Sequence, residues 1–365
     1  MTSAAIDALL LTTEPEVRYF SGFFTRFWES PARPWFLVVP LSGKPVAVIP
    51  EIGEPLMAKT WIDDIRTWPS PRPTDEGVTL LSETLREVVG DRGRTGVPMG
   101  PETTLRMPLG DYTRLTLSLP GVTFADATMV IRDQRMVKSE AEVDKIAHVC
   151  RIASDSFATI PHVVTSGQRL TDVLRDVKID LLARGVDDVP YLVGAAGPGG
   201  YDNVISAPDE RPLSEGDVLM VDVGANYDGY FCDFDRNFTL GPATADVQRG
   251  NRALHRATDA AFAAAHPGAT CAELFHAMAT VIEDAGYAVG TIGRMGHGLG
   301  MQLTEWPSHT PTDHTPLTSG MVLTLEPSLS LGAGRGLVHE ENIVIRDTGA
   351  QLLSRRAPQE MTQIG

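Results

Sequence analysis

The chain has 365 residues, of which 42% are hydrophobic and 21% are charged, and its formal net charge is -16. This length favours about two domains, and the composition is that of a globular protein with a sizeable core. The excess of acidic residues argues against nucleic acid and against an anionic membrane surface as partners.

The cysteines and the start of the chain indicate the compartment. Cys150, Cys232 and Cys271 are too few for a disulfide framework and belong to no cysteine-histidine cluster, so we expect reduced thiols. The first eleven residues lack a basic start and include Asp7, and no segment is long enough for a membrane span. We therefore expect a cytoplasmic protein with no membrane partner.

The first part of the chain alternates strand and helix patterns. The apolar runs WFLVVPL and PVAVIP, with turn residues between them, predict a β-hairpin over residues 35–50. Residues 79–91 have apolar side chains at helical spacing, and Gly90 closes the pattern. We expect an α/β domain over residues 1–132.

The second part begins with two predicted helices. Ser139 and Glu142 have the spacing of a capping box, and apolar residues recur behind them at helical spacing until Pro161. A second helix over 170–184 stops at Gly185. A hairpin follows, and then another helix pair over about 246–265 and 271–285.

This order of elements occurs twice. Gly167 and Gly185 correspond to Gly268 and Gly286, with the same offset of 101 residues for both pairs. Sequence identity between the two segments is poor, so only the layout suggests a repeat. We expect residues 133–365 to form one domain of two related halves with a cleft between them.

The hairpin between the helix pairs reads VDVGANYDGYFCDFDRNFTLG and carries Asp222 on its first strand, with Asp233 and Asp235 on its second. A four-residue loop would place Asp222 opposite Asp233, whereas a two-residue Asp228-Gly229 turn would place it opposite Asp235. In either register two carboxylates face each other among apolar neighbours. A shared proton, the nearby Arg236 or a bound cation could relieve the repulsion.

Three later segments also carry an acid or a histidine in a strand-like context. His297 stands between glycines in GRMGHGLG, Glu326 follows the apolar run MVLTL, and Glu340 and Glu341 lie in GLVHEENIVI. A carboxylate in a buried strand is costly unless it is paired. One common cation site explains all of these residues.

The order of these motifs resembles the pita-bread metallopeptidase superfamily, which includes methionine aminopeptidase, aminopeptidase P, prolidase and creatinase. The hairpin is similar to its D-x-G-x-x-Y-x-G-Y-x-x-D-x-T-R-T-F segment, which assigns the ligand role to Asp233 rather than Asp235. IRDQRMVKSEAEVDKI resembles the entry helix of the aminopeptidase P and prolidase branch, whose members carry an extra N-terminal domain. The resemblance covers about residues 130–350, and before residue 130 it rests on layout.

The resemblance implies a fold and a metal centre. The fold would be α+β: an N-terminal α/β creatinase-like domain, then a pita-bread domain with two pseudo-symmetric helix-pair-plus-strand halves around a curved antiparallel sheet. Asp233 and Glu340 would bridge two divalent ions, and Glu326 would act as the general base beside His297, the second catalytic residue. The implied ligand set is Asp222, Asp233, His297, Glu326 and Glu340. Manganese, cobalt, iron and zinc are all compatible with such ligands, and we favour manganese.

The substrate side departs from the family pattern. The proline-specific members carry two further histidines, and here those places hold Ile205 or Ser206 and Thr304. The arginine that usually stands two residues before the last glutamate ligand is replaced by Val338. The implied activity is that of a Xaa-Pro aminopeptidase or prolidase on a small peptide or amide. The alternative is an ectoine-hydrolase-like or creatinase-like hydrolase, or a metal-dependent lyase, on a small non-peptide substrate.

Several residues are candidates for the substrate site, namely Ser206, Thr304, Glu305 and His339. Strand alternation points His339 to the face opposite Glu340. We expect His309 and His314 to be packing or surface residues. In this branch the N-terminal domain often reaches a neighbouring subunit, so we expect a homodimer. The aromatic segment 24–35, expected to be exposed, would be a dimer contact, a lid or a loop packed on its own domain.

Overall fold

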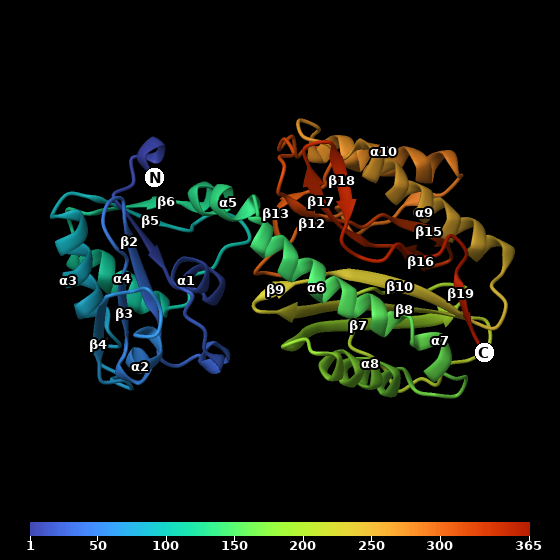
Figure 1. Cartoon of the computed structure of the whole chain (residues 1–365), viewed down its shortest axis with the longest axis horizontal. Helices are drawn as coiled ribbons and strands as arrows, with labels where there is room; N and C mark the ends of the chain where they lie inside the picture. The colour runs from blue at the N-terminus through green and yellow to red at the C-terminus, as the bar shows by residue number, and fades with distance from the viewer. The chain divides into compact units, whose positions relative to one another are not determined.

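The computed structural model describes all 365 residues and divides into two compact units, Met1–Gln134 and Arg135–Gly365 (Figure 1). The domain boundary expected from the sequence lies between residues 132 and 133. Helix α5 (Thr128–Met136) carries the chain from one unit into the other. No helix in the chain has both the length and the apolar character that crossing a membrane requires.

The N-terminal unit is a six-stranded mixed sheet with the order β4-β3-β2-β1-β5-β6. Its strands are β1 (Ala8–Leu11), β2 (Phe36–Pro40), β3 (Val46–Pro50), β4 (Asp64–Trp68), β5 (Arg94–Val97) and β6 (Thr123–Asp126). Its helices before α5 are α1 (Glu14–Ser21), α2 (Glu54–Met57), α3 (Val78–Val89) and α4 (Leu109–Ser118). β2 and β3 form the predicted antiparallel hairpin, and α3 ends at Gly90 as predicted.

The aromatic segment 24–35 differs from the expectation of exposure. Trp28 and Trp35 are 8% and 2% exposed, and their ring centroids lie 5.9 Å apart in the core of their own unit. Among its aromatic residues, only Phe24 keeps a large exposed fraction, 40%. Burial of two large indole surfaces stabilises this core, so the expectation was wrong for the tryptophans.

The C-terminal unit contains five helices and three sheets (Figure 1). The helices are α6 (Glu140–Phe157), α7 (Ile160–Val163), α8 (Leu170–Arg184), α9 (Ala245–Ala264) and α10 (Cys271–Asp284). One sheet has the order β19-β10-β8-β7, from β7 (Asp188–Pro198), β8 (Asp217–Tyr227), β10 (Phe234–Leu240) and β19 (Thr362–Ile364), with β9 (Tyr230–Phe231) paired to β8.

The remaining strands of this unit form two further sheets. One has the order β13-β12-β14-β17-β18, from β12 (His297–Gly298), β13 (Glu305–Ser308), β14 (Val322–Leu325), β17 (Glu341–Arg346) and β18 (Gly349–Leu352). The other has the order β11-β15-β16, from β11 (Ala288–Val289), β15 (Ser328–Gly332) and β16 (Arg335–Val338).

The helix predictions in this unit are confirmed with one change. Ser139 and Glu142 form the capping box at the start of α6. The helix ends at Phe157, and Pro161 lies in the first turn of the short α7 instead of terminating the long helix. A proline lacks the N–H that a helix interior needs, whereas the first turn leaves that group unused, so Pro161 begins a helix here.

The two halves expected from the repeat are present. In the first half α6 and α8 pack on β8 and β7, and in the second half α9 packs on β14, β15 and β16. A bridge between Arg169 and Pro212 precedes α8, and a bridge between Thr270 and Pro316 occupies the same position before α10. The main apolar core of this unit lies between the α9–α10 pair and the strands of the second half.

Candidate metal centre

The acidic hairpin adopts the tighter of its two expected registers. Tyr227 pairs with Tyr230 around the Asp228-Gly229 turn, and Asp222 lies opposite Asp235. Asp228 and Gly229 have φ values of 46° and 81°, the positive pair that a type I′ hairpin turn requires. Side chains two residues apart share a face of a strand, so Asp233 lies on the same face as Asp235.

An asparagine from a distant strand fixes the backbone of Asp233. The Asp233 N–H donates to Asn342 Oδ1 at 3.0 Å, and Asn342 Nδ2 donates to the Asp233 carbonyl. Asn342 belongs to β17, so this amide replaces the hydrogen bonds that a neighbouring strand would make. It holds Glu340, two residues earlier, beside the hairpin. No local sequence pattern marks Asn342, because its partner is distant in sequence.

Gly296 lets the strand that carries His297 approach the site. Gly296 has a φ of 128°, and a Cβ at this position would lie 2.3 Å from the Thr324 carbonyl oxygen. His297 Nδ1 donates to the Gly298 carbonyl at 2.8 Å, and Nε2 lies 3.4 Å from Asp233 Oδ2. This bond fixes the tautomer that turns Nε2 toward the carboxylates, as metal-binding histidines require.

The structure brings three of the five expected ligands together as a group that could hold a metal ion. Asp233, His297 and Glu340 each offer one ligand atom, and these atoms all lie within 4.8 Å of one another. All three residues are buried. Asp222 and Glu326 both lie near enough to Glu340 to raise its pKa by charge repulsion, and Glu326 also raises the pKa of Asp222.

Burial and mutual repulsion disfavour ionised carboxylates in the absence of a cation. Burial is the largest cause that raises the pKa values of Asp222, Asp233 and Glu340 well above their ordinary range, and neighbouring carboxylates add to it for Asp222 and Glu340. A hydrogen bond from the Tyr191 hydroxyl acts in the opposite direction on Asp222. Burial raises the pKa of Glu326 to about 7, while His297 opposes this shift and Asp233 adds to it.

Unpaired oxygens in this cluster fit a cation. Asp222 Oδ1 and Glu340 Oε1 are buried and have no hydrogen-bond partner. Arg236 does not neutralise them, because it donates to Glu341 Oε2 at 3.0 Å and to the Glu340 carbonyl at 2.9 Å. Carboxylates with one imidazole suit divalent ions such as manganese, iron, cobalt and zinc. The residues present therefore fit a metal centre.

Thr304 is one of the expected substrate residues, and it contacts an arginine that the sequence analysis missed. Arg294 Nη2 donates to Thr304 Oγ1 at 3.3 Å, and Nη1 donates to Ser308 Oγ at 3.4 Å. The positive charge of Arg294 lowers the pKa of both Asp233 and Glu326. Its position three residues before His297 in GRMGHG was the available signal.

Glu305 and Ser206 lie in different surroundings from Thr304. Glu305 is buried and pairs with Arg135 and, at 3.0 Å, with Lys138. Although burial acts to raise its pKa, these two cations prevail and hold the pKa at about 2. Ser206 is exposed, and its backbone N–H donates to Asn203 Oδ1 at 2.9 Å.

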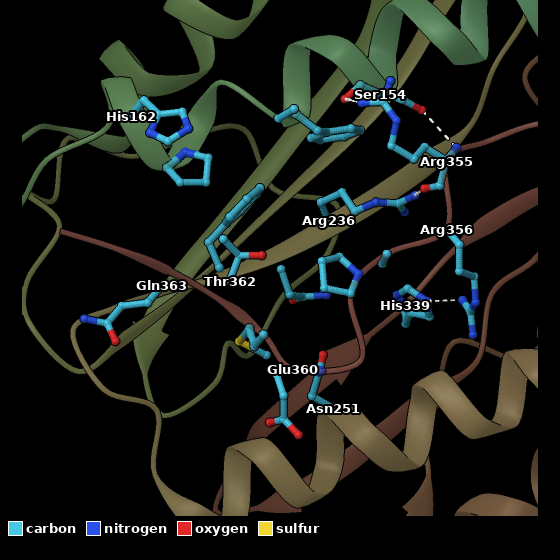
Figure 2. Close-up of a pocket in the computed structure, with 18 residues that line it drawn as sticks. Ser154, His162, Arg236, Asn251, His339, Arg355, Arg356, Glu360, Thr362 and Gln363 are labelled. Carbon is cyan, nitrogen blue, oxygen red and sulfur yellow. Dashed lines mark hydrogen bonds between the residues drawn. The ribbon is translucent and has the colours of Figure 1, made fainter.

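His339 faces away from the carboxylate cluster, in line with strand alternation. Figure 2 shows it beside Arg356 in a separate pocket of about 480 Å³, with His339 Nε2 2.8 Å from Arg356 Nη1. Burial lowers the pKa of His339 to about 3, so this imidazole is neutral. His309 is buried, with Cδ2 2.7 Å from where a Cβ on Gly296 would lie, and His314 is exposed.

Comparison with known proteins identifies both units. The model of metallopeptidase family M24 matches residues 144–347, and the creatinase/prolidase N-terminal domain model matches residues 1–137. The chain is 28% identical to a probable dipeptidase PepE of Mycobacterium tuberculosis, over 95% of this chain and 89% of that protein. It is 27% identical to a Xaa-Pro dipeptidase of Pyrococcus horikoshii, over 97% and 94%.

A solved structure agrees with these matches. The crystal structure of dipeptidase PepE from Mycobacterium ulcerans superposes with a TM-score of 0.86 at 29% identity, covering 100% of this chain and 94% of that one. The likeness extends over both units of the chain. The expected architecture, a creatinase-like N-terminal domain followed by a pita-bread domain, is confirmed.

Proposed function

The chain belongs to metallopeptidase family M24, and on this premise we propose that it is a metal-dependent dipeptidase of the Xaa-Pro type. The observation that carries the proposal is the buried group of Asp233, His297 and Glu340, which lies within the residues matched by the family. The dipeptidase relatives extend over nearly the whole chain and do not favour the ectoine-hydrolase-like, creatinase-like or lyase alternatives.

In this proposal the metal centre consists of two divalent ions held by the five acidic and imidazole residues of the cluster. Asp233 and Glu340 would be ligands shared by the two ions, and Asp222, His297 and Glu326 would complete the set. When bound, such ions make a water molecule acidic and polarise the scissile carbonyl. Manganese is the favoured metal because oxygen donors dominate the set.

Glu326 is the proposed general base. It follows β14 directly, it is only partly buried, and its pKa of about 7 lies close to neutral pH. A base with a pKa near the operating pH transfers protons most effectively. Repulsion from Asp233 raises the pKa of Glu326 and attraction to His297 lowers it. Glu326 would therefore accept the proton inside the cluster whose charges set its pKa.

The substrate wall in this proposal is formed by Thr304 and by the Arg294 guanidinium that it holds. A dipeptide carries a free carboxylate close to its scissile bond, and an arginine recognises carboxylates through paired N–H groups. Glu305, by contrast, is held in a buried ion pair, and the neutral His339 lies beside Arg356 and Glu341, so both serve the structure in this proposal. Ser206, exposed in its loop, remains a candidate for contact with the substrate.

A substrate panel tests the function. Wild-type protein with manganese, cobalt, iron or zinc is assayed with Xaa-Pro dipeptides, other dipeptides, tripeptides, cyclic amidines and N-acyl diamino acids. We expect dipeptides to be hydrolysed, and we expect Glu326→Gln to lower kcat by about 10²–10⁴-fold and also to bind less metal, because Glu326 is both the proposed base and a proposed ligand. Hydrolysis of the cyclic amidines or N-acyl diamino acids alone would favour the non-peptide alternative.

We infer further that the enzyme is a cytoplasmic homodimer. The three cysteines are buried and free, which suits a reducing compartment. The homodimer rests on the resemblance to the aminopeptidase P and prolidase branch. Light scattering of the purified full chain measures the mass directly, and a monomer mass at assay concentration would contradict the dimer.

A further inference from the structure

Asp235 is a buried acid that the ligand set does not use. It is 1% exposed and lies directly opposite Asp222 across the ladder between β8 and β10. In the family segment that the hairpin resembles, the residue two places after the second aspartate is threonine. This chain therefore places an additional carboxylate on the face that carries Asp222 and Asp233.

The hydrogen bonds of Asp235 leave one of its oxygens without a partner. Oδ2 accepts from Asn237 Nδ2 at 2.8 Å, and Asn237 Oδ1 in turn accepts from the Tyr201 hydroxyl at 2.9 Å. Oδ1 is buried and accepts no hydrogen bond. The Asn237 amide fixes one oxygen of the carboxylate and leaves the other for a group that the protein itself does not provide.

The neighbouring arginine does not provide that group. Arg236 donates to the Asp235 backbone carbonyl, while its other nitrogen donates to Glu341 Oε2 at 3.0 Å. Burial raises the pKa of Asp235, Asp222 and Glu326 add to this shift by repulsion, and the charge of Arg236 offsets it only in part. A buried anion surrounded in this way is costly unless a cation compensates it.

The geometry of the opposed pair suits chelation of one ion. Directly opposed residues of an antiparallel pair have Cβ atoms about 4.5–5.5 Å apart. Each member of this pair, Asp222 and Asp235, has its Oδ1 buried without a hydrogen bond. Two carboxylates at this separation can each direct one oxygen to a cation between them, because metal–oxygen distances are about 2.0–2.2 Å.

We propose that Asp235 is a further carboxylate ligand of the ion held by Asp222, so that this chain binds its metals with one acidic group more than the family set. The proposal rests on the metal centre of the proposed function. An additional oxygen donor favours ions with higher coordination numbers and hard ligands, such as manganese, over ions that prefer four ligands, such as zinc. Asp235 therefore determines metal preference.

Metal affinity measured by calorimetry on the metal-free full chain tests this proposal without relying on activity. We expect Asp235→Asn to raise the Kd for Mn²⁺ by about 10–100-fold. The Kd for Zn²⁺ should rise less than that for Mn²⁺, because a tetrahedral ion needs the additional donor less. Electron paramagnetic resonance of bound Mn²⁺ should change in the variant, since a direct ligand alters the coordination shell.

Asp217→Asn is the matched control. Asp217 lies on β8 like Asp222, is 1% exposed and also has an unpaired Oδ1, but Arg211 Nη2 donates to its Oδ2 at 2.9 Å. This variant should keep the wild-type Kd for both ions. Circular dichroism of the metal-free variants checks that they fold. If Asp235→Asn does not fold, Asp235→Thr, which introduces the family residue, replaces it in the affinity measurements.

The outcomes separate this proposal from the proposed function. Wild-type Mn²⁺ affinity in both Asp235 variants overturns the ligand role of Asp235 and leaves the dipeptidase proposal intact. An equal loss of Mn²⁺ and Zn²⁺ affinity overturns the role in metal preference. A wild-type chain that binds neither ion overturns the metal centre and, with it, this proposal.

Discussion

Glu340 and Glu341 are adjacent, chemically identical and almost equally buried, at 2% and 1% exposure, yet their surroundings are opposite. Glu341 accepts from Arg236 at 3.0 Å and from Arg356 at 3.1 Å. The charge of Arg236 and hydrogen bonds from the Ser354 hydroxyl and the Ala357 N–H overcome burial and hold its pKa at about 2. Glu340 has an oxygen with no partner, and burial together with four neighbouring acids raises its pKa. The protein supplies a counter-charge for one glutamate and leaves the other for an external cation.

The contrast gives a criterion that separates a buried carboxylate with a structural role from one that binds a metal ion. Burial does not separate them, since both classes are buried. The criterion is whether an arginine or lysine of the same chain reaches the carboxylate. Glu305, paired with Arg135 and Lys138, belongs with Glu341, whereas Asp222 belongs with Glu340.

The largest expected effect comes from removing the charge of Glu340. Glu340→Gln should bind less metal and lower kcat/KM for a dipeptide by at least about 10³-fold, the scale seen when a central catalytic group is lost. The free energy of unfolding of the metal-free protein should not fall, because the substitution removes repulsion. Plasma mass spectrometry of the purified variant, dipeptide kinetics and urea unfolding measure the three quantities. Wild-type metal content in this variant would contradict the ligand role.

The neighbouring substitution should have the opposite profile. Glu341→Gln leaves Arg236 and Arg356 without their shared carboxylate, and breaking a buried ion pair in this way costs about 3–5 kcal/mol of unfolding free energy. Metal bound per folded chain should stay at the wild-type level. Urea unfolding and metal analysis on the same preparation measure the two quantities. An equal loss of metal in Glu340→Gln and Glu341→Gln would show that the two glutamates do not differ in their role.

The third expected effect is a loss of folding stability at acidic pH. The pKa of Glu305 is about 2 in the folded protein, below the ordinary value of 4.5. A carboxyl whose pKa is lower in the folded than in the unfolded chain stabilises the fold fully at any pH above its unfolded-state pKa. This stabilisation is lost as the pH falls toward the folded-state pKa, here from about pH 4.5 to about pH 2. The contribution is at most about 3 kcal/mol.

Urea unfolding of the metal-free protein across this acidic range measures that loss. Glu305→Gln should be less stable at neutral pH and should lose less stability on acidification, because it carries no titrating group at this position. A variant whose stability falls with acid as steeply as that of the wild type would show that the Glu305 ion pairs do not set the acid limit.

Much of the architecture and the family could be predicted because they rest on local signals. The capping box of Ser139 and Glu142 marks the start of α6, and the glycine at 185 marks the end of α8. Strand alternation correctly turned His339 away from Glu340. The order of aspartates, GHG motif and later glutamates indicates the family from the sequence alone.

The remaining features depend on contacts between distant segments. The sequence left two hairpin registers open, and the Asp228-Gly229 turn decided between them through positive φ values at both positions. Arg236 was a candidate counter-ion for the hairpin acids, but its guanidinium pairs with Glu341, 105 residues away. Trp28 and Trp35 were expected at the surface because their pattern does not reveal which core they fill.

The clamp between Asn342 and Asp233 has a consequence for how the enzyme comes into being. Asn342 follows Asp233 by 109 positions, so this hydrogen-bonded pair cannot form until β17 has been synthesised and has folded beside the hairpin. A nascent chain that ends before β17 has the aspartate hairpin but lacks Glu340 and the amide that positions it. The metal centre is therefore incomplete until β17 has joined the hairpin.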